Sequence, residues 1–327
     1  LILPFPTILS ALGFMIGTGG SALVSKTMGE GDDEKANSLF SLLVYLTVIL
    51  GIVISAIGVI FVPQVAIRLG AQGEMIENCV VYGRIYLLAL PLFMLQYVFQ
   101  SFLVVAEKPK LGLAVTVAAG VTNMILDAVF MAVFHWGVAG AALATAISQA
   151  VGGGIPLVYF LMPNKSKLRL GKARMDGKAL IKTCTNGSSE LMTNISSNIV
   201  NILFNYQLMQ FAGEDGVSAY GVIMYCNFIF TSVFLGYSIG SAPIVGFHYG
   251  AENHTELKSL LKKSAWIIGI LSVVLLGLAE LLASYLSRIF VGYDSELLAL
   301  TQRAFRIYSV MFLFCGFNIY GSSFFTA

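Results

Sequence analysis

The sequence predicts an all-α membrane protein built from transmembrane helices. Hydrophobic residues make up 57% of the 327-residue chain, only 11% of residues are charged, and the mean hydropathy is +0.84. A soluble protein of this length with that composition would precipitate. In addition, nine stretches reach about 20 apolar residues, the length of one helical span. Small residues recur in these stretches without period-2 alternation, which favours packed helices over barrel strands.

The nine expected spans follow one another along the whole chain. They lie near residues 3–25, 39–62, 80–105, 111–134, 138–161, 188–212, 217–242, 265–289 and 303–327.

The distribution of Lys and Arg predicts the orientation, because positively charged loops stay in the cytoplasm. One set of alternate loops, which includes 106–110 and 163–187, holds 14 of the 19 basic residues. These loops are therefore expected to be cytoplasmic, and the acidic Glu214 and Asp215 are expected outside. The net charge of +2 then reflects topology and does not indicate a nucleic-acid partner.

The two halves of the sequence are repeats of each other at an offset of 221 or 222 residues. The matching pairs are Gly19–Glu34 with Gly240–Thr255, Gly70–Glu74 with Gly292–Glu296, and Arg84–Tyr86 with Arg306–Tyr308. The repeat predicts two homologous six-helix bundles, a twelve-helix fold of which about nine helices are present here. One helix is expected before residue 1 and two beyond residue 327. Because six is even, both halves share one orientation and are related by an axis along the membrane normal.

The expected domains are an N-terminal lobe at 1–162, a cytoplasmic linker at 163–187 and a C-terminal lobe at 188–327. The linker carries apolar residues that allow it to lie on the membrane surface, and a solvated linker is the alternative. These residues are Leu168, Leu170, Leu180 and Ile181.

A carboxylate at membrane depth is costly and indicates function by default. Asp127 is the deepest one predicted, and Asn123 lies one turn earlier on the same helix face. Thr145 on the next span adds a hydroxyl, so the three side chains form a candidate oxygen site for Na⁺, or for H⁺ at the carboxylate. Structural hydrogen bonds between helices, and a threonine bonded to its own helix, are the competing interpretations.

A polar stripe on the span at 188–212 predicts the lining of a water-filled cavity. Its residues fall on one helix face, and the other face is apolar; they are Glu190, Asn194, Ser197, Asn198, Asn201 and Asn205. Gln96 and Gln100 form a smaller polar pair, for which a structural role is the alternative.

These features together resemble the multidrug and toxic compound extrusion (MATE) family, within the group that includes lipid-linked oligosaccharide flippases. The segments that carry the resemblance are Gly17–Asp33, Tyr82–Leu111, Asn123–Asp127, Gly137–Thr145 and Gly236–Tyr249. The resemblance implies that Asn123, Asp127 and Thr145 form a cation site, together with an Asp on a first helix that the chain lacks. Glu190 resembles a seventh-helix carboxylate of some members, but the Gly-x-Pro usual before it is here Gly187-Ser-Ser189.

The predicted function is a cation-coupled antiporter in the bacterial cytoplasmic (inner) membrane that exports drugs or organic cations by alternating access. Na⁺ or H⁺ would be the coupling ion, with no other metal or cofactor, and a monomer is expected. A flippase for a lipid-linked precursor is the alternative, but the spans hold almost no buried Lys or Arg to bind pyrophosphate. A membrane enzyme would need a nucleophile or metal motif at membrane depth, and the three His residues have no such spacing.

Overall fold

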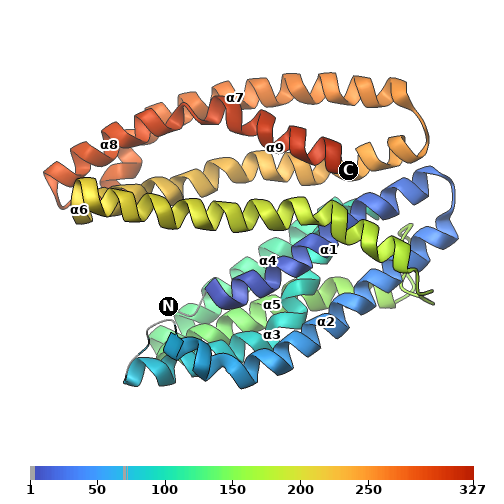
Figure 1. The fold of residues 1–327 in the computed structure, drawn as a ribbon, viewed down its shortest axis with the longest axis horizontal. Helices are drawn as coiled ribbons and strands as arrows, with labels where there is room; N and C mark the ends of the chain where they lie inside the picture. The colour runs from blue at the N-terminus through green and yellow to red at the C-terminus, as the bar shows by residue number, and fades with distance from the viewer. Residues whose placement is uncertain (1–3, 69–70, 72) are drawn as a thin grey trace. The chain divides into compact units, whose positions relative to one another are not determined.

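The computed structural model describes residues 4–68, 71 and 73–327, and over these residues it contains nine α-helices and one π-helical segment (Figure 1). The elements are α1 (Pro4–Gly29), α2 (Asp33–Arg68), α3 (Glu74–Val105), α4 (Pro109–Asp127), η1 (Ala128–Val133), α5 (Gly137–Leu161), α6 (Gly177–Gly250), α7 (His254–Val291), α8 (Ser295–Ser309) and α9 (Phe312–Thr326).

The helices reproduce the expected spans. Helices α1, α2, α3, α5 and α7 each contain one, α4 continues through η1 as one, and α6 contains two. The last span is α8 and α9 together, which meet at a bend of 48°. Within the described residues, six helices are long and apolar enough to cross a membrane, and the bent pair makes seven. The prediction of an all-helical, multi-spanning fold is confirmed.

Helix α6 is two helices joined at a glycine. Its 74 residues would extend for about 110 Å as one helix, far more than a bilayer. Gly213 breaks it with φ 62° and ψ −153°, a conformation that glycine adopts without steric cost. Figure 1 shows the chain reversing between the two parts of α6. The break falls where the sequence predicts the boundary between spans 188–212 and 217–242.

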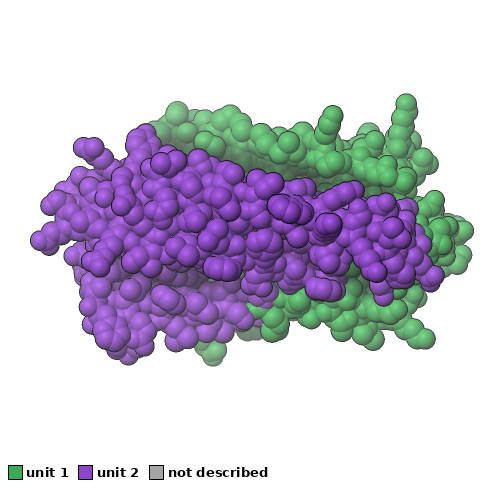
Figure 2. All heavy atoms as spheres, turned by 90° about the horizontal axis from the view of Figure 1, so that it is seen from above, with its two compact units in different colours: residues 1–192, 327 green, residues 193–326 purple. Residues whose placement is uncertain are grey.

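The chain divides into two compact units, residues 1–192 with Ala327 (unit 1) and residues 193–326 (unit 2), which Figure 2 distinguishes by colour. The division falls within α6, five residues after the predicted linker ends at residue 187.

Helix α3 is the centre of unit 1 and packs against α1, α2 and α5. Glycines on the surrounding helices permit this close approach. A Cβ atom at Gly17 of α1 would lie 3.0 Å from the carbonyl oxygen of Tyr97, and one at Gly51 of α2 would lie 2.7 Å from the Cα of Pro91. Membrane helices use small residues at interfaces because packing, and not the hydrophobic effect, holds them together.

The segment after α5 packs on unit 1. Residues 163–176 are non-helical, and α6 begins at Gly177. Leu168 is fully buried in the core of unit 1, and Leu170 and Leu180 pack against the same core, whereas Ile181 is 67% exposed. Three of the four apolar side chains proposed for a membrane surface therefore face the protein itself.

Unit 2 has its own core between the second part of α6, α7, α8 and α9. Phe234, Phe305 and Phe312 are fully buried in it. Phe230 packs against Phe312 with ring centroids 5.1 Å apart.

Candidate functional site

The predicted cation-site residues of α4 lie near its end, where the α-helix is followed by a π-helical segment. Asn123 and Asp127 are both half-buried and one turn apart, and Asp127 is the last residue of α4. The π-helical segment η1 begins at the next residue. Short π-helical turns within helices are rare and frequently occur at functional sites.

Thr145 and Tyr82 complete the surroundings of Asp127. The Thr145 hydroxyl donates to the carbonyl oxygen of Ala141 at 2.9 Å, which is the competing interpretation considered from the sequence. The Tyr82 hydroxyl lies near both the Thr145 hydroxyl and the Asp127 carboxylate. Helix α5 packs against both α3 and α4. Three helices of unit 1 thus bring a carboxylate and two hydroxyl oxygens into one neighbourhood.

The residue types in this neighbourhood are those found at monovalent-cation sites. A single carboxylate balances a single positive charge, and hydroxyl and amide oxygens are hard ligands of the kind that alkali cations prefer. Among the residues that the structure describes, no group of three His, Cys, Asp or Glu side chains could hold a metal ion. Asn123 lies on α4 beside this group. Sequence reasoning missed Tyr82 because its partners are on other helices and no local spacing connects them.

The predicted polar stripe falls on both sides of the boundary between the units. Glu190 is half-buried and belongs to unit 1. Asn201 and Asn205 are half-buried in unit 2, where the Asn205 amide donates to the backbone oxygen of Asn201 at 2.9 Å. The side chains of Asn194 and Asn198 lie outside the part of the chain that the structure describes.

Asn201 lines a cavity of about 580 Å³ within unit 2. The Tyr220 hydroxyl donates to Asn201 Oδ1 at 2.6 Å, and the Tyr220 ring stacks on Phe204 with centroids 5.5 Å apart. Tyr308 and Asn227 also line the cavity, and Asn227 Oδ1 is buried without a hydrogen-bond donor among the described residues. A largely apolar, aromatic cavity of this size with a few polar groups is typical of small-molecule sites.

The glutamine pair lies on α3 in unit 1. Gln96 packs directly on α5, where a Cβ atom at Gly152 would lie 2.5 Å from its Cδ atom. Gln100, one turn later, is half-buried. For Gln96, this packing matches the structural alternative.

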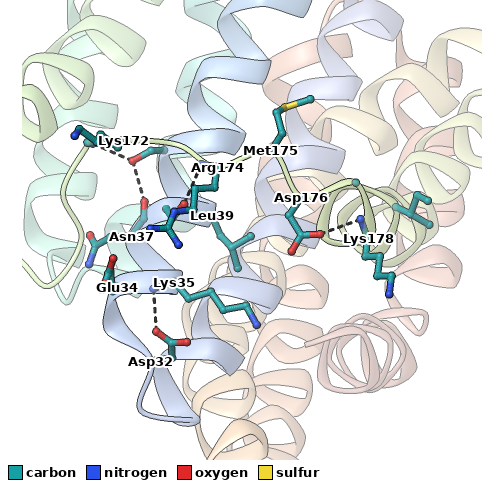
Figure 3. A pocket seen from close by; sticks show the side chains of 15 residues that line it. Asp32, Glu34, Lys35, Asn37, Leu39, Lys172, Arg174, Met175, Asp176 and Lys178 are labelled. Carbon is teal, nitrogen blue, oxygen red and sulfur yellow. Dashed lines mark hydrogen bonds between the residues drawn. The ribbon is translucent and has the colours of Figure 1, made fainter.

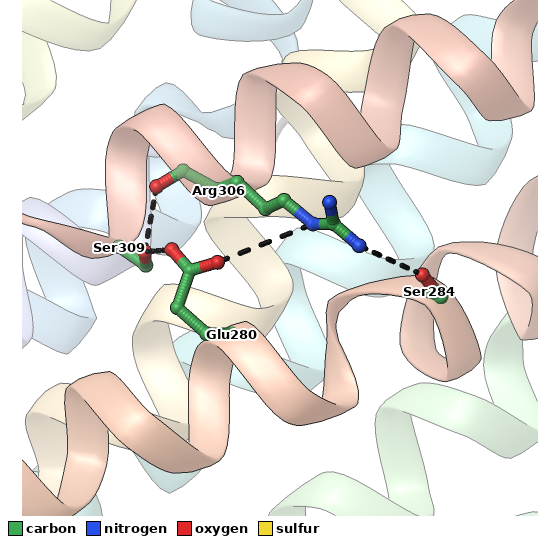
Figure 4. A network of polar contacts seen from close by, with 4 residues as sticks. All are labelled: Glu280, Ser284, Arg306 and Ser309. Carbon is green, nitrogen blue, oxygen red and sulfur yellow. Dashed lines mark hydrogen bonds and ion pairs between the residues drawn. The ribbon is translucent and has the colours of Figure 1, made fainter.

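A charged cluster in unit 2 was not predicted. Glu280 of α7 accepts a hydrogen bond from the Ser309 hydroxyl at 2.6 Å, and its other oxygen lies 4.0 Å from Arg306 Nε (Figure 4). Arg306 also donates to the Ser284 hydroxyl at 3.4 Å. Ser309 ends α8 at the bend before α9, so the cluster ties α7 to this bend.

The positions in unit 1 that correspond to Glu280 and Ser309 are also in contact, but they hold different residues. At the repeat offset of 222 residues, Gly58 corresponds to Glu280 and Leu87 to Ser309. A Cβ atom at Gly58 would lie 2.9 Å from Leu87 Cδ1, so α2 and α3 touch where α7 and α8 do. The repeat is therefore reflected in contacts within each unit.

Comparison with solved structures identifies the fold as that of the MATE transporters. A crystal structure of a MATE transporter in complex with MaL6 superposes with a TM-score of 0.94 at 20% sequence identity, over 99% of this chain and 73% of that one. An outward-facing multidrug resistance MATE family transporter of the MOP superfamily gives a TM-score of 0.92 at 21% identity, over 99% and 73%.

Sequence comparison agrees with the structures. Multidrug export protein MepA of Staphylococcus haemolyticus (strain JCSC1435) is 25% identical over 323 residues, which are 97% of this chain and 71% of that protein. MepA of Staphylococcus aureus (strain NCTC 8325 / PS 47) is 24% identical over the same length. The MatE family model matches residues 1–129 and 191–327.

The chain belongs to the MatE family, and it is a multi-pass membrane transporter. The resemblance drawn from the sequence is thereby confirmed, as is the expectation that the chain is not an enzyme, because this family consists of ion-coupled transporters.

Proposed function

We propose that this protein exports lipophilic organic cations from bacteria across the cytoplasmic membrane, driven by Na⁺ or H⁺ that binds at Asp127. The observation that carries the proposal is the position of Asp127, a half-buried carboxylate at the start of the π-helical segment η1, with Asn123 one turn earlier and Thr145 and Tyr82 nearby. The relatives named multidrug export proteins support the choice of drugs as substrates.

Exchange of one inward Na⁺ or H⁺ for one outward monovalent organic cation is electrically neutral, so the concentration gradient of the coupling ion drives a one-for-one exchange. Each further ion that enters with it would add about 2.3 kcal/mol per 100 mV of membrane potential. A fold made of two repeats suits alternating access, because one repeat can rock against the other around a fixed site.

The cavity in unit 2 supports a substrate with flat aromatic rings. Phe204 and Tyr220 offer a stacked aromatic wall, and Met224 adds an adaptable side chain. Asn227 Oδ1 is an acceptor that a ligand ammonium or amide group would satisfy.

The test uses the full-length protein in liposomes with ethidium as the fluorescent substrate. Na⁺ and H⁺ gradients are imposed separately, so that the gradient that drives transport identifies the ion. Asp127→Asn keeps shape and hydrogen bonding but removes the charge. We expect it to bind ethidium in detergent and to lose gradient-driven transport.

Asp215→Asn is the matched control, because Asp215 is an exposed carboxylate near the break in α6. It should transport at the wild-type rate. Transport by Asp127→Asn at that same rate would show that the driving ion binds elsewhere, with Glu190 as the next candidate.

A further inference from the structure

Residues 163–176, here called the basic strap, are non-helical and run along the first turns of α2. Asn37 of α2 holds this strap at two points. Its Oδ1 accepts from the backbone N–H of Arg169 at 2.6 Å, and its amide nitrogen donates to the backbone oxygen of Lys167 at 3.3 Å.

Three further α2 side chains hold the strap farther along. The Ser41 hydroxyl oxygen accepts from the backbone N–H of Gly171 at 3.0 Å, and the Tyr45 hydroxyl donates to the backbone oxygen of Gly171 at 3.0 Å. The Ser38 hydroxyl oxygen accepts from the backbone N–H of Arg174 at 3.1 Å. The strap is therefore fixed through its backbone, which leaves its side chains available for other contacts.

The side chains of the strap alternate between the protein and solvent. Ser166 is 5% exposed and Leu168 fully buried, whereas Lys165, Lys167 and Arg169 are exposed. Burial of the even-numbered residues thus directs this row of cations outward.

The exposed cations continue beyond this row into the start of α6. Those of the whole surface are Lys165, Lys167, Arg169, Lys172, Arg174, Lys178 and Lys182. Lys167 is paired with Glu107 at 2.7 Å, and it is the one cation of this set with a carboxylate partner among the described residues. The carboxylate of Asp176 is instead used in accepting backbone N–H groups at the start of α6.

This surface also borders an open cleft of about 1120 Å³ between the strap and α2. Figure 3 shows Lys172, Arg174 and Lys178 on the chain segment that lines it. Met175, between these cations, is 83% exposed. An exposed methionine and adjacent cations are the combination that meets lipid chains and lipid phosphates at a membrane surface.

We propose that the outer face of the basic strap binds the headgroups of anionic phospholipids in the cytoplasmic leaflet. The loop is cytoplasmic by its charge, and that leaflet carries a negative surface potential. Its lipids would seat their phosphates on the unpaired cations, which include Arg169, Lys172 and Arg174. The proposal does not depend on the coupling ion or on the exported substrate.

Topology alone explains why a cytoplasmic loop is basic, but it requires no fixed arrangement of the charges. The test therefore compares two variants that each remove three cytoplasmic positive charges. The strap variant carries Arg169→Gln, Lys172→Gln and Arg174→Gln. Because the structure holds this segment through backbone groups, these changes keep its hydrogen bonds. The control carries glutamine at three exposed lysines of α7, namely Lys258, Lys262 and Lys263.

The full-length protein is reconstituted with spin-labelled phosphatidylglycerol or spin-labelled phosphatidylcholine. Electron paramagnetic resonance then gives the motionally restricted fraction of each lipid. We expect the wild type and the control to prefer phosphatidylglycerol, and the strap variant to lose at least about half of that preference. The reason is that one cation near the surface raises the affinity for an anionic membrane by up to about five-fold. Raising NaCl from about 0.1 M to about 1 M should abolish the preference, because the Debye length falls from about 10 Å to about 3 Å.

Equal preference in the wild type and the strap variant would overturn the proposal, and so would an equal loss in the control. Loss of the preference with inorganic phosphate, but not with NaCl of the same ionic strength, would assign the surface to free phosphate and would also overturn it.

Discussion

Gly153 and Gly154 are consecutive residues of α5, and the same change to alanine is expected to have opposite effects at the two positions. A Cβ atom at Gly153 would overlap the backbone carbonyl oxygen of Leu92 on α3 and would lie 3.0 Å from its carbonyl carbon, where ordinary contacts are 3.4–4 Å. A Cβ atom at Gly154 would meet nothing within 4 Å.

The magnitude follows from two terms. Replacing glycine by alanine within a helix gains about 1 kcal/mol at either position. Overpacking costs about 1–3 kcal/mol, and here the obstacle is backbone, which cannot rotate away as a side chain does. The helix term cancels in the comparison, so Gly153→Ala should be less stable than Gly154→Ala by about 1–3 kcal/mol. Separation of α3 from α5 would also move Tyr82 away from Thr145 and is expected to slow transport.

The assay is thermal denaturation of the two full-length variants in detergent, followed by fluorescence-detected size-exclusion chromatography. Gly153→Ala should lose its monodisperse peak several degrees below Gly154→Ala, which should match or exceed the wild type. Equal denaturation temperatures would refute the close approach of α5 to α3 and the packing argument built on it.

Three further substitutions test other contacts by the same assay. Leu168→Ala should destabilise the protein by about 2–5 kcal/mol because its side chain is fully buried, whereas Leu161→Ala, at a 60% exposed position, should have little effect; equal effects would contradict the anchoring of the strap. Tyr220→Phe keeps the aromatic stack but removes the hydrogen bond to Asn201, so a loss of about 1 kcal/mol is expected, and an unchanged stability would argue against that bond. Glu280→Gln should cost about 1–3 kcal/mol because it leaves the Arg306 guanidinium without its counter-charge beside a membrane-spanning helix, and an unchanged stability would argue against the ion pair.

The sequence predicted those features that depend on the length and spacing of apolar residues. The spans follow from long runs of apolar residues, and the boundary within α6 follows from the end of one such run before Glu214 and Asp215. The repeat located corresponding helices because three separate segments share nearly one offset.

The sequence did not reveal contacts between side chains of different helices. Glu280 is a single charge in a strongly apolar stretch, and its partner Arg306 is on the next helix. Neither residue therefore stands out when hydropathy is averaged over a span. Tyr82 likewise becomes a neighbour of Asp127 only when the helices pack. The basic strap has no helical periodicity, and the alternation of its apolar and basic side chains could be interpreted only after Leu168 was located in the core of unit 1.

The corresponding contacts Gly58–Leu87 and Glu280–Ser309 have a consequence for the history of the two repeats. If both descend from one ancestral contact, the two positions could not have diverged independently. A glutamate at position 58 would place its carboxylate against Leu87, which offers no hydrogen-bond donor. The change to serine on the facing helix supplies the hydroxyl that Glu280 uses. The two substitutions are therefore expected to be epistatic, so that Gly58→Glu is tolerated together with Leu87→Ser and harmful alone.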